Sequence, residues 1–164
     1  MIFSSDLRAK AFTLLAEARA KGLKIATAES CTGGLIAGLL TEIAGSSDVF
    51  ERGFVTYSND AKHDMLGVRK ALIDKHGAVS EEVARAMAQG ALKHSQASLA
   101  IAVTGIAGPG GGTQAKPVSL VHIAAARKGG AVTHRVFEFG DIGRTDIRLA
   151  SVEAALEILE QLMK

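Results

Sequence analysis

Apolar residues recur every three or four positions in several long segments of the chain, which is the spacing that places them on one face of a helix. Ser5 or Asp6 can cap the first of these segments, Gly22 can end it, and Gly45 can end the second. A shorter helix is expected at residues 60–66. The long helices are predicted, in chain order, within residues 5–22, 35–45, 80–92 and 144–162.

Short runs of apolar and β-branched residues, each of strand length, separate these helices. Residues 97–103 are apolar except for Ser98, as expected of a strand that is covered on both faces. Residues 118–125 and 132–139 flank the turn residues 128–130, which predicts an antiparallel hairpin. The other strands are predicted at residues 23–28 and 50–57.

The alternation of strands and helices, followed by a hairpin, predicts an α/β fold. We expect a single three-layer α/β/α domain over residues 1–164, with a mixed, mainly parallel sheet that ends in a C-terminal hairpin plus helix. A chain of 164 residues has the ordinary size of one domain.

Composition and charge exclude several classes of function. The 19 basic and 17 acidic residues are spread along the chain, and six Phe, one Tyr and no Trp offer few stacking platforms, so no nucleic-acid partner is expected. No apolar run is long enough to span a bilayer, and a single cysteine fits a reducing compartment. Scattered histidines predict no metal site. We expect a cytoplasmic protein without a membrane partner.

The residues that join the predicted strand 23–28 to the next helix are the first candidate for chemistry. They read Ala-Glu-Ser-Cys-Thr-Gly-Gly and place the hydroxyl of Ser30 at the carboxyl edge of a sheet, where open α/β folds bind ligands. Free N–H groups at a helix start suit an anion. An ordinary capped turn, in which Ser30 and Thr32 only satisfy helix N–H groups, is an equal alternative from these residues alone.

A second loop, residues 104–113, follows the apolar strand 97–103 and holds five glycines. Each glycine loses backbone entropy on folding, so we expect these glycines to serve the close approach of a ligand rather than packing. Neither glycine loop matches a phosphate-binding fingerprint, and no Gly-x-Ser-x-Gly elbow is present.

Lys62 is the third candidate, because it falls in the first or second turn of the short helix 60–66, which Ser58 or Asn59 can cap. The helix dipole disfavours a positive charge near a helix start. The position therefore favours a lysine with an unusual role.

The motifs AESCTGGLIAGLLTEIAGSSDVFERGFVTYSNDAKHDMLGV, VSEEVARAMAQGAL, AVTGIAGPGGGT and KPVSLVHIA together resemble the C-terminal domain of the competence and damage-inducible CinA family over nearly the whole chain. Stand-alone members of that family hydrolyse nicotinamide mononucleotide to nicotinate mononucleotide and ammonia. The resemblance implies an amidohydrolase of pyridine nucleotide recycling that needs no cofactor.

Amide hydrolysis needs a nucleophile, a base and donors for the oxyanion. With the resemblance, we expect Ser30 as the nucleophile, Lys62 as a base with a lowered pKa, and Tyr57 as a relay or orienting group between them. Cys31 is a rival nucleophile, but no imidazole is placed to pair with its thiol.

Backbone N–H groups from either glycine loop can form the oxyanion hole or hold the phosphate, and the sequence leaves open which loop does which. Arg144 is expected to bind the phosphate, with Arg148 as the alternative. Ser119 stands where the family usually has glycine. The predicted substrate-binding residues are Thr32, Gly33, Gly34, Thr104, Gly105 and Arg144.

The partner expected from the resemblance is the small-molecule substrate, nicotinamide mononucleotide. We also expect a homo-oligomer and favour a dimer. No sequence pattern bears on the oligomeric state. The alternative function is a non-catalytic nucleotide-binding module linked to competence or the DNA-damage response.

Overall fold

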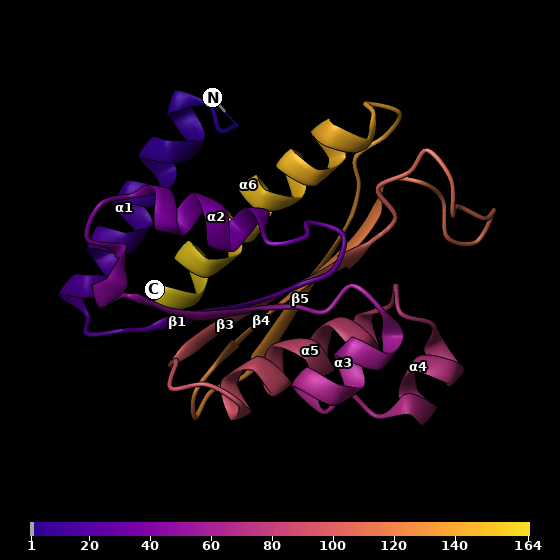
Figure 1. The fold of residues 1–164 in the computed structure, drawn as a ribbon, viewed down its shortest axis with the longest axis horizontal. Coiled ribbons are helices and arrows are strands. Elements are labelled where there is room, and N and C mark those ends of the chain that lie inside the picture. Colours follow the sequence, from indigo (N-terminus) through magenta and orange to yellow (C-terminus); the bar gives the residue numbers. More distant parts are fainter. Residues whose placement is uncertain (1) are drawn as a thin grey trace.

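Five strands in the order β2-β1-β3-β4-β5 form the central sheet of the computed structural model, which describes residues 2–164 (Figure 1). Its elements are α1 (Ser5–Ala20), β1 (Ile25–Glu29), α2 (Leu35–Glu42), η1 (Ser46–Asp48), β2 (Phe50–Val55), α3 (Asn59–Leu66), α4 (Lys70–His76), α5 (Glu81–Lys93), β3 (Leu99–Gly105), β4 (Leu120–Arg127), β5 (Val132–Glu138) and α6 (Arg144–Met163).

The sheet is mixed, as the sequence predicts. β1 is parallel to both β2 and β3, whereas β4 is antiparallel to β3 and pairs with β5 as a hairpin. Helices α1, α2 and α6 cover one face, and α3, α4 and α5 cover the other (Figure 1). The three-layer α/β/α prediction is confirmed. Within residues 2–164, no helix has both the length and the apolar content that crossing a membrane requires.

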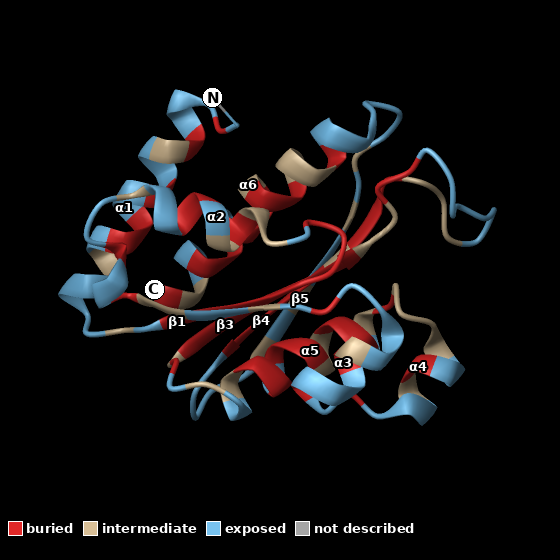
Figure 2. Ribbon diagram, viewed as in Figure 1, coloured by how far each residue is buried: buried red, intermediate tan, exposed pale blue. Residues whose placement is uncertain are grey.

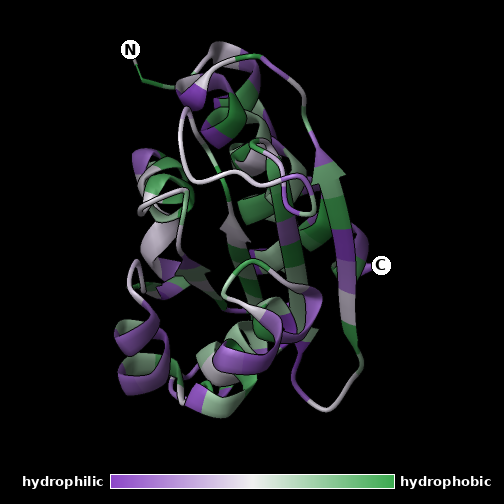
Figure 3. Ribbon diagram, turned by 90° about the vertical axis from the view of Figure 1, so that its right-hand side faces the viewer, coloured by the Kyte–Doolittle hydropathy of each residue, from purple (hydrophilic) through white to green (hydrophobic). Residues whose placement is uncertain are grey.

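The two faces of the sheet bury side chains of different size. Along β3, Leu99, Ile101 and Val103 join the core under α1, α2 and α6. Ala100 and Ala102 join the core on the side of α3, α4 and α5. Small residues on that side let α5 pack close to the sheet. Burial is concentrated in the central strands and the helix faces turned toward them (Figure 2), and these strands are also the more hydrophobic part of the fold (Figure 3).

The structure differs from the sequence-based expectation in one helix and in several boundaries. Helix α4 was not predicted, because of its seven residues only Ile73 is buried and no side chain caps its start. β2 ends at Val55, two residues before Tyr57, and α2 begins at Leu35, as predicted, but ends at Glu42, before Gly45; five residues separate it from the end of β1 at Glu29. A five-residue turn, rather than a helix start, therefore carries Ser30.

Strand register brings the ends of β1 and β2 to one level, two residues before the end of β3. Glu29, the last residue of β1, lies opposite Val55 of β2 and Val103 of β3. The chain leaves β1 toward the layer of α2 and leaves β2 toward the layer of α3 (Figure 1). This divergence makes a crevice at the carboxyl ends of adjacent strands, which is where open α/β sheets bind ligands.

Ser119 directly precedes β4 and is the only non-glycine residue with a positive φ in the described part of the chain, at 83°. The left-handed region is unfavourable for residues with a Cβ. Two hydrogen bonds hold Ser119 there: its N–H donates to the carbonyl of Ile106 at 2.8 Å, and its hydroxyl accepts from the N–H of Gly140 at 2.9 Å. The side chain therefore compensates for the strained backbone.

Replacing Ser119 separates these two effects. Ser119→Ala keeps the strain and leaves the Gly140 N–H without its acceptor, so we expect a loss of about 1–2 kcal/mol in the free energy of unfolding. Ser119→Gly loses the same hydrogen bond but relieves about 1–2 kcal/mol of strain, so its stability should stay near that of the wild type. Urea unfolding measures both. Equal losses in the two variants would contradict the explanation.

Candidate active site

A cavity of about 280 Å³ opens at the carboxyl ends of the parallel strands. Its walls come from the ends of β1 and β3, the β2–α3 connection, the glycine-rich loop after β3 and the start of α6. Six predicted site residues line the cavity, namely Ser30, Tyr57, Lys62, Thr104, Gly105 and Arg144. The structure thus brings together residues that are up to 114 positions apart in the sequence.

Ser30 and Lys62 are in direct contact. Lys62 Nζ lies 3.0 Å from Ser30 Oγ, 2.8 Å from the carbonyl of Thr56 and 3.4 Å from the carbonyl of Tyr57. A neutral amine has two N–H donors and one lone pair. Because the two carbonyls can accept both protons, the lone pair is left to accept the hydroxyl proton of Ser30. The contacts therefore suit an amine that removes a proton from serine.

Burial supports the neutral form of Lys62. Its side chain is 1% exposed, and it forms no ion pair within residues 2–164. Desolvation lowers its pKa from 10.5 to about 8. At pH 7, about a tenth of the molecules then carry the neutral amine. Lys62 can therefore serve as a general base near neutral pH.

Cys31 is 6% exposed, and burial raises the pKa of its thiol to about 11. Since the thiolate and not the thiol is the nucleophile, this environment disfavours attack by Cys31. The hydroxyl of Ser30, in contact with a base, is the better-placed nucleophile.

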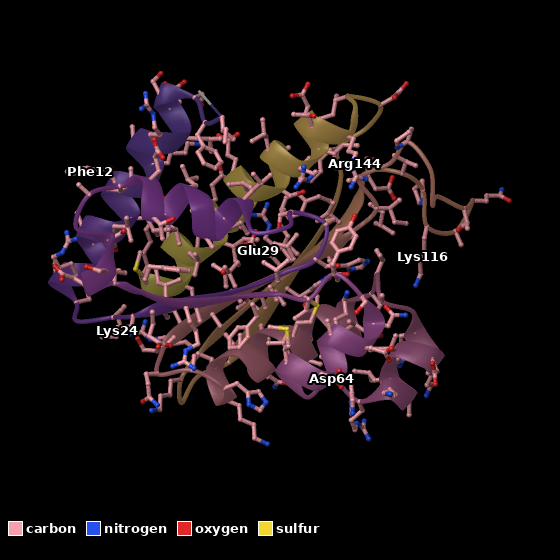
Figure 4. The ribbon with its side chains drawn as sticks, in the orientation of Figure 1. Phe12, Lys24, Glu29, Asp64, Lys116 and Arg144 are labelled. Carbon is pink, nitrogen blue, oxygen red and sulfur yellow. The ribbon has the colours of Figure 1, made fainter. Side chains whose placement is uncertain are left out.

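The carboxylate of Glu29, at the end of β1, lies against the start of α2, where the sequence predicted an anion-binding site. Its carboxylate accepts hydrogen bonds from the N–H groups of Ile36 at 2.9 Å and Ala37 at 3.0 Å, and from the hydroxyl of Thr32 at 2.7 Å. It lies between the end of β1 and α2 (Figure 4). These amides are therefore satisfied internally, and the expectation that they are free for an external anion is wrong.

The turn after Ser30 carries the free N–H groups instead. The N–H of Gly33 donates to the carbonyl of Ser30 at 3.0 Å. Within residues 2–164, the N–H groups of Cys31 and Thr32 donate to no acceptor. Cys31 lines the cavity, whereas the predicted substrate-binding residues Thr32, Gly33 and Gly34 do not, so of these N–H groups only that of Cys31 lies where a substrate can reach it.

Two arginines one helical turn apart on α6 have different environments. Arg144 lines the cavity and donates to the carbonyl of Gly108 at 2.8 Å (Figure 4). Arg148 does not line the cavity, and its guanidinium donates to the carbonyls of Cys31 and Thr32 at 3.0 and 3.2 Å. Of the two, Arg144 is the one placed to meet a ligand. No sequence pattern predicts the contacts of Arg148, because its partners are backbone atoms.

Tyr57 stands at the rim of the cavity with 61% of its surface exposed. Its hydroxyl accepts a hydrogen bond from Arg144 at 3.1 Å and bonds to neither Ser30 nor Lys62. Only its backbone carbonyl contacts Lys62. The structure therefore does not place the Tyr57 hydroxyl between the nucleophile and the base.

Packing explains most of the glycines in the loop after β3, contrary to the expectation. A Cβ at Gly105 would lie 2.7 Å from Val121 Cγ2, and one at Gly112 would lie 2.7 Å from the N atom of Val118. Gly108 faces the same Val118 side chain. Only Gly110 and Gly111 lack such close neighbours. Of the five glycines, these two alone are left to allow the approach of a ligand.

The lowered pKa of Lys62 predicts a pH-dependent stability. Between about 8 and its ordinary value of 10.5, the unfolded chain holds a proton that the folded chain has lost. The free energy of unfolding should therefore rise with pH across this window, by roughly 3 kcal/mol. Lys62→Met has no amine to bury, so its free energy of unfolding should exceed that of the wild type at pH 7. This difference should disappear by pH 10.5.

Urea unfolding of both proteins at several pH values tests this expectation. Both proteins carry Cys31→Ala, because the Cys31 thiol interacts electrostatically with Lys62 and would otherwise contribute to the difference. Parallel pH profiles would contradict the burial of a charged amine as the cause.

Comparisons with known proteins show the family of the chain. The CinA C-terminal domain family model matches residues 7–163. The nicotinamide-nucleotide amidohydrolase PncC of Escherichia coli strain K12 is 50% identical over 144 residues, which are 87% of this chain and 86% of that protein. A CinA-like protein of Mycolicibacterium vanbaalenii is 52% identical over 140 residues, 85% of this chain and 33% of that protein. The chain also spans 34% of two Caldicellulosiruptor relatives.

Solved structures share the fold. The crystal structure of the competence/damage inducible protein CihA from Agrobacterium tumefaciens has a TM-score of 0.97 and 56% identity, covering 99% of this chain and 98% of that one. The CinA superfamily protein ECK1530/EC0983 from Escherichia coli has a TM-score of 0.91 and 33% identity, covering 98% and 93%. The chain belongs to the CinA C-terminal domain family.

Proposed function

We propose that the protein hydrolyses the carboxamide of nicotinamide mononucleotide to nicotinate mononucleotide and ammonia, with Ser30 as nucleophile and Lys62 as base. The observation that carries the proposal is the 3.0 Å contact between the Ser30 hydroxyl and the buried Lys62 amine. The name of the E. coli relative, nicotinamide-nucleotide amidohydrolase, supports the choice of substrate. The reaction would serve pyridine nucleotide recycling.

In the first half-reaction, neutral Lys62 takes the proton of Ser30 as Oγ attacks the carboxamide carbon. The N–H group of Cys31, a residue that lines the cavity, has no acceptor within residues 2–164 and is the proposed donor to the oxyanion. The C–N bond then breaks. The ammonium group of Lys62 gives its proton to the departing NH₂ group, which leaves as ammonia, and an ester joins Ser30 to the nicotinoyl group.

In the second half-reaction, a water molecule attacks the ester and neutral Lys62 takes a proton from it. The N–H group of Cys31 also donates to this second oxyanion. When the C–O bond breaks, Lys62 returns the proton to Ser30 Oγ and the carboxylic acid product is released. Lys62 thus gains and loses one proton in each half, so a single residue serves as base and acid.

Arg144 is the proposed partner of the substrate phosphate. Its guanidinium lines the cavity and contacts only a carbonyl and a hydroxyl. Its positive charge therefore has no anionic partner among the described residues. Gly110 and Gly111 line the same cavity without a side chain. The tyrosine ring of residue 57 borders this space and can contact the nucleotide.

Removal of either reacting group tests the assignment. In Ser30→Ala and Lys62→Met, ammonia release from nicotinamide mononucleotide should fall by a factor of about 10³ or more, because nucleophile and base act as a unit. Lys75→Met, which changes an exposed lysine on α4, should keep the wild-type rate. Cys31→Ala should keep most of it, because its thiol takes no part.

These measurements distinguish an amidohydrolase from a non-catalytic nucleotide-binding module, and they also identify the nucleophile. Turnover that survives Ser30→Ala but is lost in Cys31→Ala would exclude serine as the nucleophile. Wild-type protein that binds nicotinamide mononucleotide in calorimetry but releases no ammonia would instead support the non-catalytic nucleotide-binding module.

The assignment of Lys62 as the base predicts how the rate depends on pH. Since only neutral Lys62 can accept the proton, kcat/KM should rise about tenfold per pH unit below a pKa of about 8 and level off above it. Measurements should start above pH 6.5, since the phosphate of the substrate titrates near pH 6. A profile that is flat from pH 6.5 to 9 would exclude Lys62 as the base.

A further inference from the structure

We infer that Tyr57 is a positioning residue whose hydroxyl holds the Arg144 guanidinium at the phosphate end of the cavity, so that the site selects a phosphorylated nucleoside over the free nucleoside. The inference rests on the proposed function and deepens it, because it names the part of the substrate that this end of the cavity recognises. It also gives a role to a hydroxyl that bonds to neither the nucleophile nor the base.

Packing does not explain the position of the Tyr57 side chain. The residue is 61% exposed, and it belongs to neither of the two hydrophobic cores on the faces of the sheet. It lines the cavity. Within residues 2–164, the one hydrogen bond of its side chain is the bond that the hydroxyl accepts from Arg144 Nη2 at 3.1 Å. The contacts of this side chain therefore point to the cavity rather than to the stability of the fold.

The backbone of Tyr57 is fixed at the reacting end of the cavity. Its carbonyl lies 3.4 Å from Lys62 Nζ. The preceding residue, Thr56, donates its N–H to the carbonyl of Glu29 at 2.9 Å, and its own carbonyl accepts from Lys62 at 2.8 Å. The side chain of Tyr57 therefore starts beside the base and ends at Arg144. This one residue links the end of the cavity where the amide reacts to the end that is proposed to bind phosphate.

Two other segments of the chain hold the Arg144 guanidinium. Nη1 donates to the carbonyl of Gly108, in the loop after β3, at 2.8 Å, and Nη2 donates to the Tyr57 hydroxyl on the β2–α3 connection. A guanidinium has five N–H donors, so three remain for phosphate oxygens. Among residues 2–164, no carboxylate forms an ion pair with Arg144. Its charge is therefore held in place and is available to an anion.

The hydroxyl matters because Arg144 is an exposed residue. A long exposed side chain loses rotamer freedom when a ligand orders it, and this loss weakens binding. The Tyr57 hydroxyl and the Gly108 carbonyl order the guanidinium before the substrate arrives, so much of the loss has already occurred in the folded protein. Without the hydroxyl, only the contact with Gly108 remains. Binding of the phosphate should then weaken, whereas the reaction at Ser30 should not change.

Tyr57→Phe tests the inference, because it removes the hydroxyl and keeps the ring. KM for nicotinamide mononucleotide should rise about threefold to tenfold, as expected for the loss of one hydrogen bond to a charged group, while kcat stays within about twofold. The kcat/KM for nicotinamide riboside, which lacks the phosphate, should not change. Thr13→Val is the matched control, since it removes an exposed hydroxyl that donates to the carbonyl of Ala9 on α1, and it should keep all of these constants.

The Arg144→Met background tests whether the hydroxyl acts through the guanidinium. There, adding Tyr57→Phe should change KM by less than about twofold, because no guanidinium is left to position. An unchanged KM in Tyr57→Phe alone, an equal rise in both backgrounds, or an equal loss for mononucleotide and riboside overturns the inference. A fall in kcat of about a hundredfold with KM unchanged also overturns it, because the hydroxyl would then act in proton transfer.

Calorimetry separates failure of the inference from failure of the proposed function, because binding needs no turnover. Tyr57→Phe should bind nicotinamide mononucleotide about threefold to tenfold more weakly than the wild type and Thr13→Val. If the wild type binds the nucleotide but releases no ammonia, the proposed function fails and the comparison of affinities still decides the inference. Equal affinities in the wild type and Tyr57→Phe, or a wild type that neither binds nor hydrolyses the nucleotide, overturn the inference.

Discussion

A lysine amine buried without an anionic partner is the constraint on which the site depends. Lys62 is 1% exposed, and its contacts are one hydroxyl and two carbonyls. A permanent charge in that position would be costly, so the protein tolerates the residue best as a neutral amine. The same desolvation that weakens the fold near neutral pH lowers the pKa of the amine, so that part of it is neutral and able to accept the proton of Ser30. Stability is exchanged for reactivity within one side chain.

The sheet makes this contact possible by ending β1 and β2 at one level, beside the last residues of β3. Glu29 pairs with both Val55 and Val103, so the chain segments that follow emerge side by side. The segment after β1 turns toward α2 and the segment after β2 turns toward α3 (Figure 1). Ser30 and the helix that carries Lys62 therefore face each other across the crevice. The contact between Ser30 and Lys62 is a consequence of topology, because neither segment could form it alone.

Sequence patterns predicted the parts of this structure that depend on local signals. Periodic apolar residues and caps located five of the six α-helices, and chemistry together with family resemblance selected Ser30 and Lys62. The parts that depend on distant packing were not predictable. A Cβ at Gly105 would collide with a valine on β4, and the N–H groups at the start of α2 donate to Glu29. The hydroxyl of Tyr57 accepts a hydrogen bond from Arg144. None of these partners lies at a fixed spacing in the sequence.

Helix α6 shows how one element can serve ligand and scaffold together. Arg144 and Arg148 are four residues apart and so lie on the same side of the helix. Because α6 begins at the rim of the cavity, its first residue reaches the open space, while the arginine one turn further in meets only the backbone of the turn after Ser30. Depth along the helix, and not residue type, divides the two roles. A shift of α6 along its axis would disturb both at once, which couples phosphate binding to the geometry of the proposed oxyanion donor.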